Sequence, residues 1–124
     1  GDMVPGAPMD DAPVTGGWLL PHAGERFVLM LFSDGTVSPA QRAVLDALAQ
    51  DRIPVQALVV VPAGVPLVEG LATVQDLQGL AAQRYDARAG TAYLLRPDQH
   101  VAARWRTLDA ATVRAAVARA TAHA

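Results

Sequence analysis

The segment Tyr93–Ala102 limits the possible folds of this chain most strongly, because it holds two apolar runs on either side of a Pro-Asp pair. Proline presets the backbone angle that the first central position of a type I turn requires, which suits Pro97. The side chain of Asp98 can then accept a hydrogen bond from a backbone amide beyond the turn. The segment therefore predicts an antiparallel β-hairpin late in the chain.

A helix is predicted soon after this hairpin. Asp109 is a candidate N-cap, and apolar residues follow it at helical spacing. These residues are Val113, Ala116, Val117 and Ala120. A hairpin followed by a C-terminal helix is typical of the second half of a thioredoxin-like fold.

Two runs predict buried strands. Phe27–Phe32 is apolar at every position, and Val55–Val61 is rich in β-branched residues. A strand without a polar face belongs inside a sheet that is covered on both sides, so helices are expected above and below it. Upstream, Trp18–Leu20 is expected to form a short N-terminal hairpin with Phe27–Phe32 across a turn at residues 21–25.

The clearest helix start is at Ser38, where a capping box with Gln41 coincides with proline at the first helical position. The helix should end near Asp51, because Pro54 cannot continue it. Its inward stripe is predicted to be Val44, Leu45 and Leu48.

A second helix is expected from Thr73, with Asp76 completing its cap. Its inward residues would be Leu77, Leu80 and Ala81. The elements then follow the order β-β-α-β-α-β-β-α, including the short N-terminal hairpin, and a right-handed crossover makes the strands of the first βαβ unit parallel. The predicted fold class is α/β and thioredoxin-like, with a central mixed sheet and helices on both faces.

Residues 1–13 contain several Pro and Gly residues and have no regular period. They predict an arm or linker from an upstream domain, followed by one thioredoxin-like domain over residues 14–124. Asp10 and Asp11 lie on this arm, where we expect them to keep it solvated, because no rigid element would hold them at catalytic spacing.

Composition excludes several classes of function. The 124 residues include no cysteine, so this chain has no disulfide, thiolate metal site or cysteine nucleophile. A net charge of −2 leaves no excess of cations for a nucleic-acid backbone. Apolar runs are far shorter than the ~20 residues of a membrane span. We therefore expect no nucleic-acid or membrane partner. No secretory signal is visible at the amino terminus, so a cytoplasmic location is expected.

Residues 33–38 lie where a redox thioredoxin carries its two cysteines, between the first core strand and the first helix. The proline that usually precedes the third strand of that fold is also missing, since residues 89–91 are Ala-Gly-Thr. We therefore predict no dithiol redox activity.

No catalytic, cofactor-binding or metal-binding residue is predicted. His22, His100 and His123 are too scattered to suggest a metal cluster. Ser33 and Asp34 lack the glycines of a nucleophile elbow, so they are expected to form turns. No glycine-rich nucleotide loop occurs.

Trp18 and Trp105 could be core residues or interface anchors, and we expect both to be buried or half-buried. Trp105 stands between Arg104 and Arg106. In a strand these arginines face away from the tryptophan, toward solvent or a partner with carboxylates.

Residues 1–8, Phe27–Phe32, and Tyr85 together with Tyr93–Ala102 resemble the C-terminal thioredoxin-like domain of FAD-dependent aromatic-ring hydroxylases. These flavin monooxygenases include phenol hydroxylase and hydroxyphenylpropionate hydroxylase. The three stretches resemble, in order, the linker from the FAD domain, the first core strand and an Arg-Pro-Asp-Gly hairpin. Two positions depart from the family pattern: Gln99 replaces the usual glycine, and Trp105 lies further along than the family's tryptophan.

The resemblance implies that FAD, NAD(P)H oxidation and ring hydroxylation belong to upstream domains of a longer polypeptide. This chain would then be a noncatalytic domain with a structural or subunit-contact role and no cofactor of its own. Its partners would be the upstream FAD-binding domain and, in a homodimer, a second copy. An exposed apolar or arginine-rich patch is expected. Two alternatives are a free-standing, cysteine-free thioredoxin-like binding adaptor and a small peroxidase or transferase relative.

Overall fold

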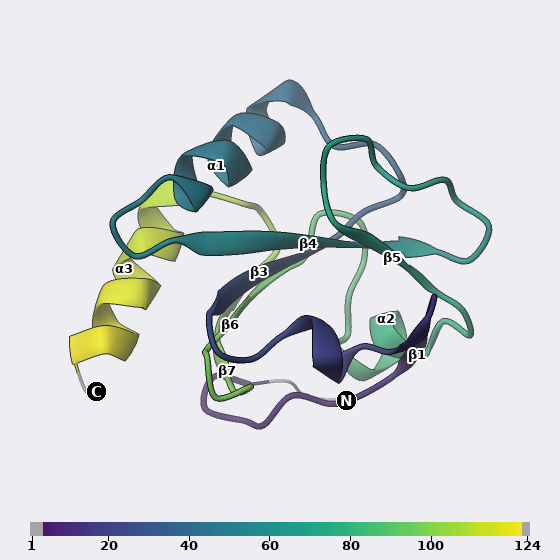
Figure 1. The fold of residues 1–124 in the computed structure, drawn as a ribbon, viewed down its shortest axis with the longest axis horizontal. Helices are drawn as coiled ribbons and strands as arrows, with labels where there is room; N and C mark the ends of the chain where they lie inside the picture. Colours follow the sequence, from purple (N-terminus) through teal and green to yellow (C-terminus); the bar gives the residue numbers. More distant parts are fainter. Residues whose placement is uncertain (1–3, 123–124) are drawn as a thin grey trace.

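The computed structural model describes residues 4–122, which form a mixed sheet of seven strands with helices on both faces (Figure 1). The strands lie in the order β2-β1-β5-β4-β3-β6-β7. Their bounds are β1 Pro13–Val14, β2 Gly17–Trp18, β3 Phe27–Phe32, β4 Val55–Pro62, β5 Thr73–Asp76, β6 Ala92–Leu95 and β7 Val101–Trp105. The helices are α1 Pro39–Ala49, α2 Leu80–Arg84 and α3 Ala110–Ala122, and η1 is a 3-10 turn at Leu20–His22.

Strand β3 forms the centre of the sheet, as its apolar sequence predicts. All six of its residues are buried. It pairs in parallel with β4 and antiparallel with β6, so both of its edges are occupied. Alternate side chains enter separate cores on the two faces: Phe27, Leu29 and Leu31 on one, and Val28, Met30 and Phe32 on the other.

Helices α1 and α3 lie side by side and cover one face of the sheet (Figure 1). The predicted capping box is present, with Ser38 Oγ accepting from the Gln41 amide and Gln41 Oε1 accepting from the Ser38 amide. Asp109 accepts a bond from the Thr112 amide at 3.2 Å and caps α3. The predicted inward residues Leu45, Leu48, Val113, Ala116 and Val117 are buried.

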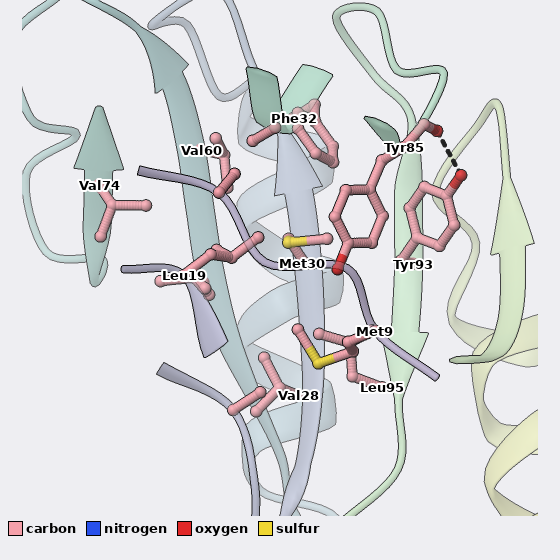
Figure 2. Close-up of a cluster of buried hydrophobic side chains, with 14 of the residues drawn as sticks. Met9, Leu19, Val28, Met30, Phe32, Val60, Val74, Tyr85, Tyr93 and Leu95 are labelled. Atoms are coloured by element: carbon pink, nitrogen blue, oxygen red, sulfur yellow. Dashed lines mark hydrogen bonds between the residues drawn. The ribbon is translucent and has the colours of Figure 1, made fainter. Parts of the chain in front are cut away.

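The opposite face is covered by α2 together with a long N-terminal segment. Figure 2 shows Met9 and Leu19 among the side chains of β3, β4 and β6 in this core. Ala12 and Leu19 have no exposed surface. Ala7, Met9 and Ala12 therefore pack into this core, which an arm of small residues and prolines did not predict.

The prediction of a helix that begins at Thr73 is wrong. Thr73–Asp76 is strand β5, which pairs in parallel with β4, with Val74 beside Val60. The β-branched pair Thr73-Val74 suits a strand, and a free edge of β4 is available to it. The helix begins only at Leu80, after Gly79 with φ +70°, although Asp76 does cap it.

The N-terminal hairpin is formed by other residues than predicted. Trp18–Leu20 does not pair with β3, because β4 and β6 already occupy both edges of that strand. Instead β1 pairs with β2, and Val14 also pairs with Asp76 of β5. Leu20 begins the turn η1.

The late hairpin is confirmed as β6 and β7. The Gln99 amide donates to the Arg96 carbonyl at 2.9 Å, which places Pro97 and Asp98 at the centre of the turn. Gln99 has φ +63°, and the register shifts beside Leu95. The carboxylate of Asp98 pairs with the Arg96 side chain, and a hydrogen bond from the His100 backbone, beyond the turn, also acts on it as expected; both lower the pKa of Asp98.

Candidate functional site

The loop after β3 uses its own polar side chains to hold its shape. Ser33 Oγ accepts from the Gly35 amide at 3.0 Å and donates to the Thr36 carbonyl at 3.1 Å. Asp34 accepts from the Thr36 amide at 2.9 Å. These are side-chain turns, as expected for turn-forming residues. The Ser33 hydroxyl is therefore engaged with backbone groups of its own loop.

Thr91 faces this loop in the place where thioredoxins usually carry proline. It is 1% exposed, and its carbonyl accepts from the Phe32 amide at 2.9 Å. Its hydroxyl accepts from the Arg88 amide and from the Arg106 side chain. Thr91 thus ties the end of β3 to the start of β6.

A pocket of about 540 Å³ opens beside this loop. It lies at the carboxyl ends of β3, β4 and β5, which meet at one edge because these strands are parallel. Openings at this edge are where open α/β sheets most often bind ligands. The apolar lining residues are Phe32, Val60, Val61, Pro62, Ala63, Leu77, Ala82, Ala87 and Ala89.

Asp76 forms a buried polar wall of the pocket. Its side chain is 4% exposed, and its two oxygens accept from the amides of Ala81 at 3.0 Å and Ala82 at 2.9 Å. This carboxylate holds the first turn of α2 at the end of β5. The sequence indicated a capping role for Asp76 but placed it in a helix, and the pocket itself was not predicted.

Behind the pocket, Phe32, Tyr85 and Tyr93 form an aromatic cluster (Figure 2). The Tyr93 hydroxyl donates to the Tyr85 carbonyl, and the Tyr85 hydroxyl donates to the Asp10 carbonyl at 2.6 Å. Burial, followed by the nearby charge of Asp10, raises the pKa of Tyr85 well above its ordinary value. The cluster thus fastens the N-terminal segment to α2 and β6.

Asp10 and Asp11 do more than keep the arm solvated. The carboxylate of Asp11 accepts from the amides of Ala12 and Leu20, and its carbonyl accepts from Arg84. These bonds fold the segment back onto η1 and α2. The expectation is therefore wrong for Asp11, whose carboxylate is bonded within the domain, whereas Asp10 is exposed as expected.

The histidines remain apart in the structure. His22 lies in η1, His100 precedes β7, and His123 lies outside the described residues. Among residues 4–122 no group of three metal-ligating side chains gathers. None of the helices described is long and apolar enough to cross a membrane.

The two tryptophans differ in burial. Trp105 is half-buried against the core under α1 and α3, as predicted. Trp18 is 56% exposed on the edge strand β2, so the expectation of burial is wrong for this residue. The carboxylate expected near Arg104 and Arg106 is Asp86 of the same chain, at 3.7 and 3.1 Å.

Two kinds of protein are found among the solved structures that are similar to this chain. Neither a protein-family model nor a curated protein sequence matches it. The flavin-dependent monooxygenase PieE, solved with FAD and substrate, matches 93% of the chain at 27% identity with a TM-score of 0.70. Aklavinone-11 hydroxylase, solved with FAD and aklavinone, matches 86% at 23% identity with a TM-score of 0.62. The chain spans 19% of the length of each of these proteins.

PrxQ from Xylella fastidiosa matches 99% of the chain at 13% identity with a TM-score of 0.65, and here the match covers 98% of PrxQ. A putative thiol:disulfide interchange protein DsbE from Chlorobium tepidum matches 96% at 16% identity with a TM-score of 0.64. The fold is thioredoxin-like. In this thioredoxin-like chain the loop after β3 carries serine, aspartate and threonine but no cysteine.

Proposed function

We propose that this chain is the C-terminal, noncatalytic domain of a FAD-dependent, NAD(P)H-using aromatic monooxygenase. The observation that carries the proposal is the similarity to PieE over 93% of this chain but only 19% of that protein. A second FAD-containing hydroxylase shows the same partial coverage. In this proposal residues 1–13 lead from the FAD-binding part of the polypeptide and also pack against this domain through Met9 and Ala12, and FAD and NAD(P)H bind upstream.

A structural role agrees with the chemistry of the loop after β3. The chain has no cysteine for a dithiol reaction. The side chains of Ser33 and Asp34 are engaged with backbone groups of the loop itself. The domain therefore contributes surface, and its partner would be the flavin-binding part or, in a homodimer, a second copy.

The surface proposed for this contact lies at the β2 edge of the sheet. Trp18 is opposite Pro13, and Val14 is opposite Asp76, which Leu77 follows in the chain. Trp18 is 56% exposed and Leu77 is 45% exposed. Tryptophan is enriched at contact sites between proteins, and Trp18 lies on an edge strand.

The size of the native polypeptide tests the proposal. An antibody against this chain would capture the protein from its source cells, and intact mass and flavin absorbance would then be measured. A product several-fold larger than 13.0 kDa that carries FAD is expected. A flavin-free product of 13.0 kDa would overturn the proposal.

A second test concerns the Trp18 surface. In the native flavoprotein, Trp18→Ser should lower the thermal unfolding midpoint, because it removes an apolar contact with the flavin-binding part. In the isolated chain the same change should have little effect, since the side chain is already exposed. Leu67→Ser is a matched control, because Leu67 is 62% exposed in the β4–β5 loop. Equal effects of both substitutions in the flavoprotein would contradict the assignment of this surface.

A second candidate function is a free-standing thioredoxin-like binding adaptor. The matches to PrxQ and DsbE favour it, because they cover nearly the full length of both proteins. A native product of 13.0 kDa without flavin would support this function.

A further inference from the structure

We propose that the pocket at the carboxyl ends of β3, β4 and β5 binds a small organic anion, an aromatic or aliphatic carboxylate with an apolar body. This inference rests on the pocket alone and does not depend on the proposed function. The volume of about 540 Å³ is within the range of roughly 300–1,000 Å³ that small-molecule sites occupy.

The floor of the pocket suits an apolar body. The side chains of Phe32 and Val60 form it and are each less than 5% exposed. Ala82 of α2 and Ala87 of the following loop form a side wall of small residues. Since these side chains are small, a flat ring system can lie against them without displacing a larger group.

The polar groups of the pocket indicate the sign of the ligand's charge. Both oxygens of Asp76 accept backbone amide bonds, and Ser33 and Asp34 are bonded to the backbone of their own loop. Arg88 lies on the rim, where its guanidinium has no hydrogen-bond or ion-pair partner among residues 4–122. This guanidinium is the cationic group of the pocket lining that is available to a ligand, and its paired donors match a carboxylate.

Asp34 opposes an anion at the same rim. It is exposed, so solvent and salt screen its charge, and one of its oxygens is already held by the Thr36 amide. The proposal requires that the Arg88 donors outweigh this repulsion. Neutralising Asp34 should consequently strengthen the binding of an anion.

The test is a titration of the full chain with 2-naphthoate, 2-naphthylmethanol and 2-naphthylmethylamine. Binding is measured by amide chemical shifts and by calorimetry. Naphthoate should saturate one site, with shifts at the ends of β3, β4 and β5 and in residues 87–89. The neutral alcohol should bind about fivefold to tenfold more weakly, and the amine more weakly still.

Arg88→Gln should weaken naphthoate binding by about fivefold to tenfold and leave binding of the alcohol unchanged. Asp34→Asn should strengthen naphthoate binding. Arg52→Gln is the charge-matched control, because Arg52 is exposed and does not line this pocket. Ala82→Leu should fill the pocket and abolish binding of naphthoate and of the alcohol. The thermal unfolding midpoint of this variant checks that it is folded.

Absence of saturable shifts in these residues would overturn the proposal. So would tighter binding of the amine than of naphthoate, or an equal loss of affinity in Arg88→Gln and Arg52→Gln.

Discussion

At the scale of single residues, Gln99 combines two roles in the β6–β7 turn. Its φ of +63° is a conformation that glycine adopts at no steric cost. Its side chain donates to the Leu20 carbonyl at 2.9 Å and so fastens the turn to η1. The hydrogen bond offsets part of the cost of holding a residue other than glycine in this conformation.

We predict that Gln99→Ala destabilises the fold more than Gln99→Gly. Both variants lose the bond to Leu20, which is worth about 1 kcal/mol. Glycine also relieves the left-handed strain, so the two variants should differ by about 1 kcal/mol in unfolding free energy. Urea unfolding measures this difference. A Gly variant that is no more stable than the Ala variant would show that the turn carries no such strain.

Tyr85 should make the fold sensitive to alkali. Its pKa in the folded chain is raised mainly by burial and to a smaller extent by the charge of Asp10. A tyrosine in the unfolded chain ionises at about pH 10. The folded state therefore holds the proton more tightly. This contribution to stability is complete below about pH 10 and is lost as the pH rises through the folded-state value.

Tyr85→Phe should accordingly reduce the loss of stability between about pH 9 and pH 11. The same variant should lose about 1 kcal/mol at neutral pH, because its hydroxyl no longer donates to the Asp10 carbonyl. Urea midpoints across this pH range check both effects. Parallel curves for the two proteins would place the alkaline sensitivity elsewhere.

At the scale of elements, the capping box of α1 is a strong local signal. Ser38→Ala should cost about 1 kcal/mol of unfolding free energy, since the Gln41 amide loses its acceptor. Thr36→Ala is a suitable control, because Thr36 is exposed and its bonds within the loop are made by backbone atoms. Chemical unfolding of both variants tests the prediction, which fails if the two substitutions cost the same.

Elements with local signals were predictable from the sequence. Helix α1 has its capping box, α3 has Asp109 before a helical stripe, and β3 and β4 have long apolar runs. Each signal lies within about a dozen residues, so no distant contact is needed to interpret it.

The missed elements depend on distant partners. Strands β1 and β2 have two residues each, and β1 is held by pairing with β5, more than sixty residues later. Strand β5 has four residues, and its final Asp76 is also the cap of α2, which made the segment resemble a helix start. Pairing with distant strands determines the secondary structure of these segments and overrides their local sequence signals.

The candidate site was predictable only in part. The sequence located the loop at residues 33–38, because it follows a clear strand and precedes a clear helix. The pocket beside it is built from the ends of three strands, α2 and the loop after α2. Alignment of these ends depends on strand order, and that order required β5 to be recognised.

At the scale of the whole molecule, the N-terminal segment closes one face and one edge of the sheet. The Gly6 amide donates to the Val101 carbonyl, and the Val101 amide donates to the Ala7 carbonyl. Met9 fills the core beneath, where it is 7% exposed. The segment thus protects part of the β7 edge and covers the apolar side chains of β3.

Met9→Asp should therefore cost more than about 4 kcal/mol, because it removes a buried apolar side chain and introduces an unpaired charge. Val4→Asp should change stability by less than about 0.5 kcal/mol, since Val4 is 52% exposed. Far-ultraviolet circular dichroism during urea unfolding compares the two. A small cost for Met9→Asp would mean that the segment detaches without loss of the core.

The packing of the N-terminal segment also determines the order in which the nascent chain can fold. The Met9 amide donates to the Gln99 carbonyl, and the Gly6 amide donates to the Val101 carbonyl. Each bond joins positions some ninety residues apart, so neither can form until the later residue has been synthesised. During synthesis on the ribosome, the face of β3 that the N-terminal segment covers in the folded protein stays exposed until the β6–β7 hairpin has emerged. Rapid translation of the final quarter would shorten this exposed interval, and pausing there would lengthen the time in which a chaperone is needed.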